Sequence, residues 1–141
     1  MKKRFMACVA LLVPALLLSG CSFFIFDDKD EIVSVDKTVS QENTTRITAH
    51  LMEKVPNIRA EKLKLSAGDK KIKMTVSIIS APEPNYTKND RDYRYHAEYY
   101  WVYVSYRSKD RLEKYDTYLV HKDLADIYHV DSAADDFIKV A

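Results

Sequence analysis

Two stretches of alternating side chains constrain the fold of this 141-residue chain more than any other feature. In the first stretch, polar residues alternate with Ile72, Met74, Val76 and Ile78. In the second stretch, residues 93–107, aromatic or apolar side chains occur at both the odd-numbered and the even-numbered positions. Successive side chains of a strand point to opposite faces of a sheet. The first stretch therefore predicts a strand with one buried face, and the second predicts a strand that needs cover on both faces.

The tyrosines form one feature rather than ten, because all of them lie between Tyr86 and Tyr128. One face of the predicted strand carries Tyr95, Tyr99, Trp101 and Tyr103. Tyrosine and tryptophan are enriched at the centres of protein interfaces, so these four residues are the candidate binding face. A packed core whose phenol groups reach solvent at its edge is the alternative. Cover on this face could come from a C-terminal helix, a second copy in a homodimer, a flat ligand or a partner protein.

His96 and Glu98 form the candidate polar site, because a strand would point both side chains the same way. Such a pair can perform acid–base chemistry. Zinc needs three or four converging ligands, and the spacing of the four histidines fixes no third ligand. The sequence also shows no nucleophile motif. We therefore expect a binding protein with no catalytic residues, no metal site and no cofactor.

The remaining pattern predicts one helix and several short strands. A helical pattern runs from residue 36 to residue 55, with Asp36 or Ser40 as its cap and Pro56 as its end. Residues 62–65 alternate leucine with lysine and predict a strand that pairs with residues 72–78, with Gly68 in the turn at positive φ. Further strands are expected at 112–121 and 126–130, and a closing helical turn after Ser132.

This order of elements predicts an α+β fold. One N-terminal helix would pack on a curved antiparallel sheet of four to five strands, followed by a short C-terminal helix. The order resembles the cystatin-like arrangement, in which a curved sheet wraps around a single helix. The resemblance is carried by the order of the elements alone and by no sequence motif.

The N-terminus has the composition of an export signal. Lys2, Lys3 and Arg4 are the only charges in the first 26 residues, and the uncharged stretch 5–18 follows them. A bilayer-spanning helix needs roughly 20 apolar residues, so this stretch has the length of a signal peptide core. It leads into Leu18-Ser19-Gly20-Cys21.

The sequence Leu18-Ser19-Gly20-Cys21 resembles the lipobox of bacterial lipoproteins. The resemblance implies cleavage between Gly20 and Cys21, lipid attachment to the Cys21 thiol and acylation of the new amino group. It also implies a location at the cell envelope. Lipoproteins of enteric bacteria that stay in the inner membrane carry aspartate at the next position, so Ser22 favours the outer membrane where the organism has one.

The chain is thus expected to consist of a signal peptide (1–20), a lipidated cysteine with a short tether (21–31) and one α+β domain (32–141). Its two glycines are too far apart for a phosphate-binding loop. Without its N-terminal charges it is slightly acidic, so nucleic acid is not an expected partner. We expect a lipid-anchored envelope protein with a non-catalytic binding or assembly role, most simply with an envelope protein as partner. The alternative is a small-ligand carrier or enzyme, with a cavity between helix and curved sheet and His96 and Glu98 at its rim.

Four lysines give a weaker second signal. The polar face of the predicted hairpin carries Lys62, Lys64, Lys71 and Lys73. Like charges opposite each other destabilise a sheet, so they are either solvated or compensated by an anionic surface. Phospholipid headgroups are such a surface for a domain tethered close to a membrane.

Overall fold

The computed structural model describes residues 30–68, 71–87, 91–109 and 111–141. The predicted signal peptide, Cys21 and most of the predicted tether lie outside these ranges. The elements follow one another as β1 (Glu31–Ser34), α1 (Gln41–Lys54), α2 (Asn57–Leu65), β2 (Ile72–Ser80), α3 (Tyr93–Glu98), β3 (Tyr99–Ser108), β4 (Arg111–His121), β5 (Ile127–Asp131) and β6 (Asp136–Lys139).

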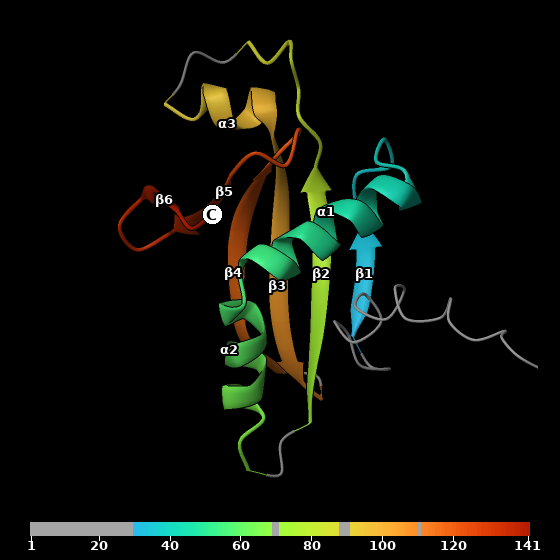
Figure 1. Ribbon diagram of the computed structural model, residues 1–141. Coiled ribbons are helices and arrows are strands. Elements are labelled where there is room, and N and C mark those ends of the chain that lie inside the picture. Colours follow the sequence, from blue (N-terminus) through green and yellow to red (C-terminus); the bar gives the residue numbers. More distant parts are fainter. Residues whose placement is uncertain (1–29, 69–70, 88–90, 110) are drawn as a thin grey trace, which may run out of the picture.

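The six strands form one mixed sheet in which spatial order follows chain order, from β1 to β6. β1 pairs with β2 in parallel, and every later pair is antiparallel. Helices α1 and α2 pack on one face of the sheet, while α3 lies at the end where β3 begins (Figure 1). The parallel β1–β2 pair is possible because α1 and α2 supply the long crossover that parallel neighbours need.

Helix α1 begins at Gln41, after Ser40, the second of the two predicted caps, and ends at Lys54, just before Pro56. The Ser40 hydroxyl accepts a hydrogen bond from the backbone N–H of Asn43 and caps the first turn. Val55 caps the C-terminal end, and Pro56 then separates α1 from α2. Between these ends, the side chains of Ile47 and Leu51 are fully buried against the sheet.

The core lies between the two helices and one face of the central strands. From α2 it receives Ile58, and from β2 and β3 it receives Met74, Val76, Ile78, Val102, Val104 and Tyr106. The Tyr106 hydroxyl donates a hydrogen bond to the backbone oxygen of Ile58, 3.0 Å away, and so ties α2 to β3. Burial of each of the large aliphatic side chains stabilises the fold by about 1.5–3 kcal/mol.

The predicted fold, one helix on an antiparallel sheet of four to five strands, is wrong. The sheet has six strands and is mixed, and two helices cover it. Residues 62–65, predicted as a strand, form the last turn of α2. Leu63 is 73% exposed, so the leucine–lysine alternation there does not reflect burial. The buried residue of α2 is Ile58, one helical turn or more away from those leucines.

The predicted C-terminal helix is also wrong, because residues 131–139 form the β5–β6 hairpin. The Asp131 carboxylate accepts the backbone N–H groups of Ala133 and Ala134, at 3.0 and 3.1 Å. Asp135 adopts a φ of 53°, which aspartate tolerates better than most residues. These contacts replace the backbone hydrogen bonds of a helical turn, so the chain reverses into β6.

Residues 93–98 were expected to begin the central strand, but they form α3. The strands predicted at 72–78, 112–121 and 126–130 correspond to β2, β4 and β5. Gly68 has a φ of 81°, as expected, although it follows a helix rather than joining two strands. Alternation thus identified the inner strands of the sheet, whereas aromatic content alone did not distinguish strand from helix.

Candidate functional site

The sheet face opposite α1 and α2 has two parts, and the first is open to solvent. Register places Val33, Ser77, Tyr103 and Thr117 in one row across four strands. The neighbouring row contains Glu31, Thr75, Ser105 and Tyr115. We call the accessible uncharged residues that these rows contribute from β1 to β4 the open face: Val33, Thr75, Ser77, Tyr103, Ser105 and Tyr115.

Two tyrosines dominate the open face. Tyr103 is 40% exposed and Tyr115 is 54% exposed, and their ring centroids lie 6.3 Å apart. The neighbouring side chains are hydroxyls and one valine, and the nearest charges on β1 and β2 are Glu31, in the row of Tyr115, and its ion-pair partner Lys73. Such a surface offers flat apolar rings together with hydrogen-bond donors and acceptors.

The second part of this face is closed by a cluster of rings from α3, β3, β5 and β6. The Tyr95 ring packs on Phe137 at 4.1 Å and on Tyr99 and Tyr128 at 5.4 Å between centroids. We call this set the end cluster: Tyr95, Tyr99, Tyr128 and Phe137. Leu119 is fully buried in the same part of the sheet. The end cluster therefore serves as a small second core.

Tyr99 anchors the end cluster through a polar contact. Its side chain is fully buried, and its hydroxyl donates a hydrogen bond to Asp126 Oδ1 at 2.7 Å. Burial raises the pKa of the Tyr99 phenol, and the hydrogen bond to Asp126 raises it further. Arg94 Nη2 donates to the Tyr99 hydroxyl oxygen at 3.5 Å. Tyr99 thus joins α3 to the β4–β5 turn.

His96 lies in a stack of three rings. Its imidazole is sandwiched between Tyr86, at 4.4 Å, and Trp101, at 4.8 Å, with both interplanar angles at 17°. The Trp101 Nε1 atom is buried and has no acceptor in the part of the chain that the structure describes. A buried donor left unpaired costs about 1–3 kcal/mol. The His96 ring is thus held on both faces by aromatic neighbours.

The structure separates most of the residues that the sequence grouped. Tyr95, His96 and Glu98 lie on α3 rather than on a strand. Glu98 pairs with Arg94 at 3.8 Å and His96 is held in its stack, so the two do not converge as a polar site.

Of the four candidate binding residues, Tyr103 alone is classed as exposed. Sequence reasoning did not single out Tyr115, its neighbour on β4. Tyr115 shares one face of β4 with Thr117 and Leu119. Only the register between β3 and β4 shows that this is the face that carries Tyr103.

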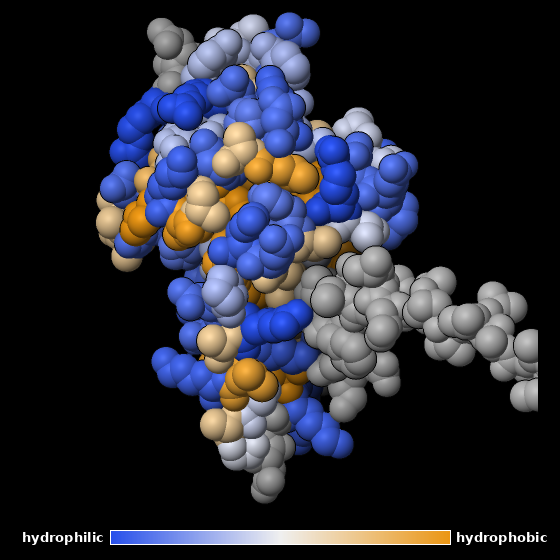
Figure 2. All heavy atoms as spheres, in the orientation of Figure 1, coloured by the Kyte–Doolittle hydropathy of each residue, from blue (hydrophilic) through white to orange (hydrophobic). Residues whose placement is uncertain are grey.

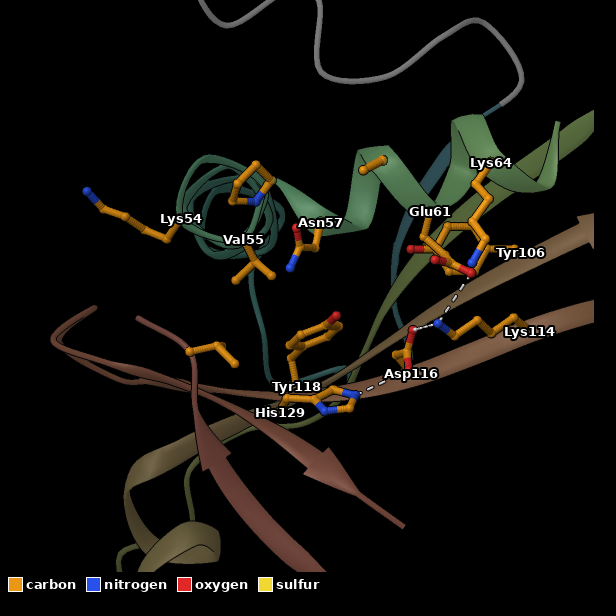
Figure 3. Close-up of a pocket in the computed structure, with 13 residues that line it drawn as sticks. Lys54, Val55, Asn57, Glu61, Lys64, Tyr106, Lys114, Asp116, Tyr118 and His129 are labelled. Carbon is orange, nitrogen blue, oxygen red and sulfur yellow. Dashed lines mark hydrogen bonds and ion pairs between the residues drawn. The ribbon is translucent and has the colours of Figure 1, made fainter. Parts of the chain in front are cut away.

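A cavity of about 450 Å³ lies on the other face, between α2 and strands β4 and β5 (Figure 3). Asp116 occupies one side of it. His129 Nε2 lies 3.2 Å from Asp116 Oδ1, and Lys114 Nζ lies 3.4 Å from Asp116 Oδ2. Lys114 also approaches Glu61 of α2 at 3.5 Å. The Lys114–Glu61 ion pair connects α2 to the sheet, and Lys114, Glu61 and Asp116 place charged groups along the cavity.

Tyr118 forms another wall of this cavity. Its side chain is only 6% exposed, and Figure 3 shows its hydroxyl directed towards α2 and Asn57. Burial raises the pKa of the Tyr118 phenol, and the charge of Asp116 adds to the shift. The Tyr106 hydroxyl donates to the backbone oxygen of Ile58, whereas the Tyr118 hydroxyl makes no hydrogen bond to another described residue.

Neither a metal centre nor a spanning helix is found in the ranges that the structure covers. Within them, no three histidine, cysteine, aspartate or glutamate side chains gather as metal ligands would. None of the helices in those same ranges has the length and apolar character needed to cross a bilayer.

Comparison of the chain with protein-family models, with curated proteins and with solved structures finds no match.

Proposed function

We propose that the chain is a lipid-anchored cell-envelope protein that binds a protein partner through the open face. The exposed pair Tyr103 and Tyr115, on the sheet face that α1 and α2 do not cover, is the observation that carries this proposal. Of the binding face expected from the sequence, Tyr103 remains in this surface, whereas Tyr95 and Tyr99 belong to the end cluster.

The chemistry of the open face supports a protein as the partner. Tyrosine supplies a large contact area with only two rotatable side-chain bonds, so little conformational entropy is lost on binding. The surrounding serines and threonines offer hydrogen bonds without the desolvation cost of charges. A regular sheet also holds these groups in fixed positions, which lowers the entropic cost of association.

The proposed lipid anchor is supported by the sequence Leu18-Ser19-Gly20-Cys21 and by the short stretch of chain between Cys21 and the domain. Strand β1 begins at Glu31, ten residues after Cys21. Even a fully extended link of this length spans at most about 36 Å. A lipid on Cys21 would therefore hold the open face near the membrane, where partners of envelope proteins are found.

Cell fractionation of a Cys21→Ala variant tests the anchor. The wild-type chain is expected in the membrane fraction with incorporated lipid label, and the variant is expected to lose both. Unchanged membrane association and labelling in Cys21→Ala would overturn the assignment.

A crosslinking pull-down tests the partner. The double variant Tyr103→Ala/Tyr115→Ala is expected to lose the captured partner, because it removes both exposed rings of the open face. The matched control is Tyr93→Ala, which removes a tyrosine of similar exposure, 46%, from α3. Equal loss in both variants, or capture that survives the double change, would contradict the proposal.

The cavity favours a second candidate function, the binding of a small polar ligand. The Tyr118 hydroxyl and the Asn57 amide lie on opposite sides of a cavity large enough for a small molecule. A ligand with a hydrogen-bond acceptor could bridge them. In native mass spectrometry of the purified protein, this function predicts a retained small molecule that is lost in Tyr118→Phe. If wild-type protein taken directly from cells showed only the mass of the protein itself, with no bound small molecule, this second function would be refuted.

A further inference from the structure

Basic residues gather at the end of the domain where β2 begins. In Figure 1 this end contains the C-terminus of α2, the start of β2 and the β3–β4 turn. Two segments meet there, 62–73 and 107–114, and their described residues include eight lysines and arginines against one acidic residue. The chain as a whole is nearly neutral, so this end concentrates its positive charge.

Part of this charge is neutralised within the fold. Lys62 pairs with Asp30 at 2.8 Å, and Lys114 with Glu61 at 3.5 Å. Lys73 pairs with Glu31. Two of the four lysines that the sequence grouped are therefore already compensated. The exposed cations of this end, which we call the basic end, are Lys64, Lys71, Arg107, Lys109 and Arg111.

Two leucines are exposed beside these cations. Leu63, on α2, is 73% exposed, and Leu112, at the start of β4, is 43% exposed. Apolar atoms reach the surface over α2 in Figure 2, within a mostly hydrophilic surround. Cations around protruding apolar side chains are the combination that binds the interface of an anionic bilayer, where the cations contact headgroups and the apolar groups enter the acyl boundary.

The path of the chain brings the basic end towards the anchor. Glu31 pairs with Thr75, three residues into β2 from its first residue, so β1 starts about 10 Å from the basic end. β1 then runs parallel to β2 and away from that end. An extended link from Cys21 to Asp30 spans at most about 32 Å. The predicted lipid site is therefore tethered nearer to the basic end than to α3.

The opposite end of the domain has the reverse charge. The described residues of its segments, 83–98 and 121–126, include five acidic residues against three lysines and arginines. Asp123 in the β4–β5 turn is 75% exposed at its side chain. An anionic membrane surface would attract the basic end and repel this one, so the charge distribution alone selects one orientation.

We propose that the basic end docks on anionic phospholipid headgroups, which holds the strands steeply inclined to the membrane and leaves the open face free at the side. The proposal rests on the lipid anchor of the proposed function, which supplies the proximity. Each lysine or arginine at an anionic surface is expected to strengthen this docking about fivefold, and salt is expected to weaken it.

Lysine acylation of the lipidated full chain in vesicles tests the orientation. The vesicles contain phosphatidylcholine alone or mixed with phosphatidylglycerol, and flotation first reports whether the chain is anchored. Lys64 and Lys71 are expected to be acylated severalfold more slowly in the mixed vesicles, and added salt should remove the difference. Lys37 and Lys122, which are exposed towards the other end, should react equally in both. Equal rates at all four lysines would overturn the docking.

A pair of double variants completes the test. Lys109→Gln/Arg111→Gln removes two charges from the basic end and should abolish most of the protection of Lys71. Lys37→Gln/Lys122→Gln changes the net charge by the same amount and should leave that protection intact. Equal effects of the two variants would show a response to net charge rather than docking, and would overturn the proposal. A chain that fails to float refutes the anchor instead.

Discussion

The two faces of the sheet differ in what their side chains contact. On the helix-covered face, Val102 and Val104 of β3 are fully buried among aliphatic residues from α1 and α2. On the other face of the same strand, the exposure of the side chains increases along the chain, from the buried Tyr99 to the half-exposed Tyr103. One strand therefore stabilises the domain through one face and presents a surface through the other.

This difference separates stability from binding in a way that substitutions can test. Changes on the helix-covered face and in the end cluster should lower the free energy of unfolding. Changes on the open face should leave it nearly intact and affect the partner instead. The predictions below run from the largest expected effect to the smallest.

Leu51→Ala should have the largest effect on stability. The Leu51 side chain is fully buried between α1 and the sheet, and truncation leaves a cavity. We expect the free energy of unfolding to fall by about 2–5 kcal/mol, measured by urea denaturation. If Leu51→Ala lowered the free energy of unfolding by less than Tyr103→Ala does, the helix-covered face would not be the main core.

Tyr99→Phe tests whether the end cluster is a second core. The change removes the 2.7 Å hydrogen bond to the Asp126 carboxylate and leaves a carboxylate oxygen unpaired. A loss of about 1.5–3 kcal/mol is expected in urea denaturation. Tyr115→Phe, on the open face, is the control and should change stability by less than about 0.5 kcal/mol. Equal values would remove the distinction between the two parts of this face.

Asp36 makes the helix-covered side sensitive to acid. The hydroxyl and amide of Thr38, followed by the Ala81 amide, donate hydrogen bonds to its carboxylate and lower its pKa below the ordinary 3.8. Because the folded state has the lower pKa, this stabilisation is present at neutral pH and is lost as pH falls through the folded-state pKa. Asp36→Asn should cost about 1 kcal/mol at pH 7 and little at pH 2, in denaturation curves at both pH values. A cost that does not change with pH would contradict this role.

Two buried tyrosines of the helix-covered face should respond differently to loss of the hydroxyl. Tyr106→Phe removes the hydrogen bond to Ile58 and should cost about 1 kcal/mol. Tyr118→Phe removes a hydroxyl that faces the cavity and should cost less than about 0.5 kcal/mol. The difference should appear in thermal denaturation. A larger cost for Tyr118→Phe would show that its hydroxyl has a structural role.

Alternation predicted the parts of the fold where burial follows a two-residue period. In β2, Ile72, Met74, Val76 and Ile78 are all buried, as the pattern required. The pattern failed at Leu63, where an exposed leucine on a helix imitated a strand, and at residues 93–98, where tyrosines pack around α3. In those segments, tertiary contacts rather than local period decide the structure.

The candidate site was less predictable than the fold. Tyr103 was identified because it lies on a strand that is aromatic along one face. Its neighbour Tyr115 is fixed by the register between β3 and β4, and the cavity around Asp116 is fixed by how α2 packs on the sheet. Both depend on contacts between segments distant in sequence, which a single sequence does not specify.

Photocrosslinking in cells tests most directly whether the open face is the binding face. A photoreactive amino acid replaces Tyr103 in one strain and Arg46, an exposed residue of α1, in another. The account predicts a discrete crosslinked product from position 103 and none from position 46. The same product from position 46 alone would place the partner on the helices, and the absence of any product at position 103 would contradict the account.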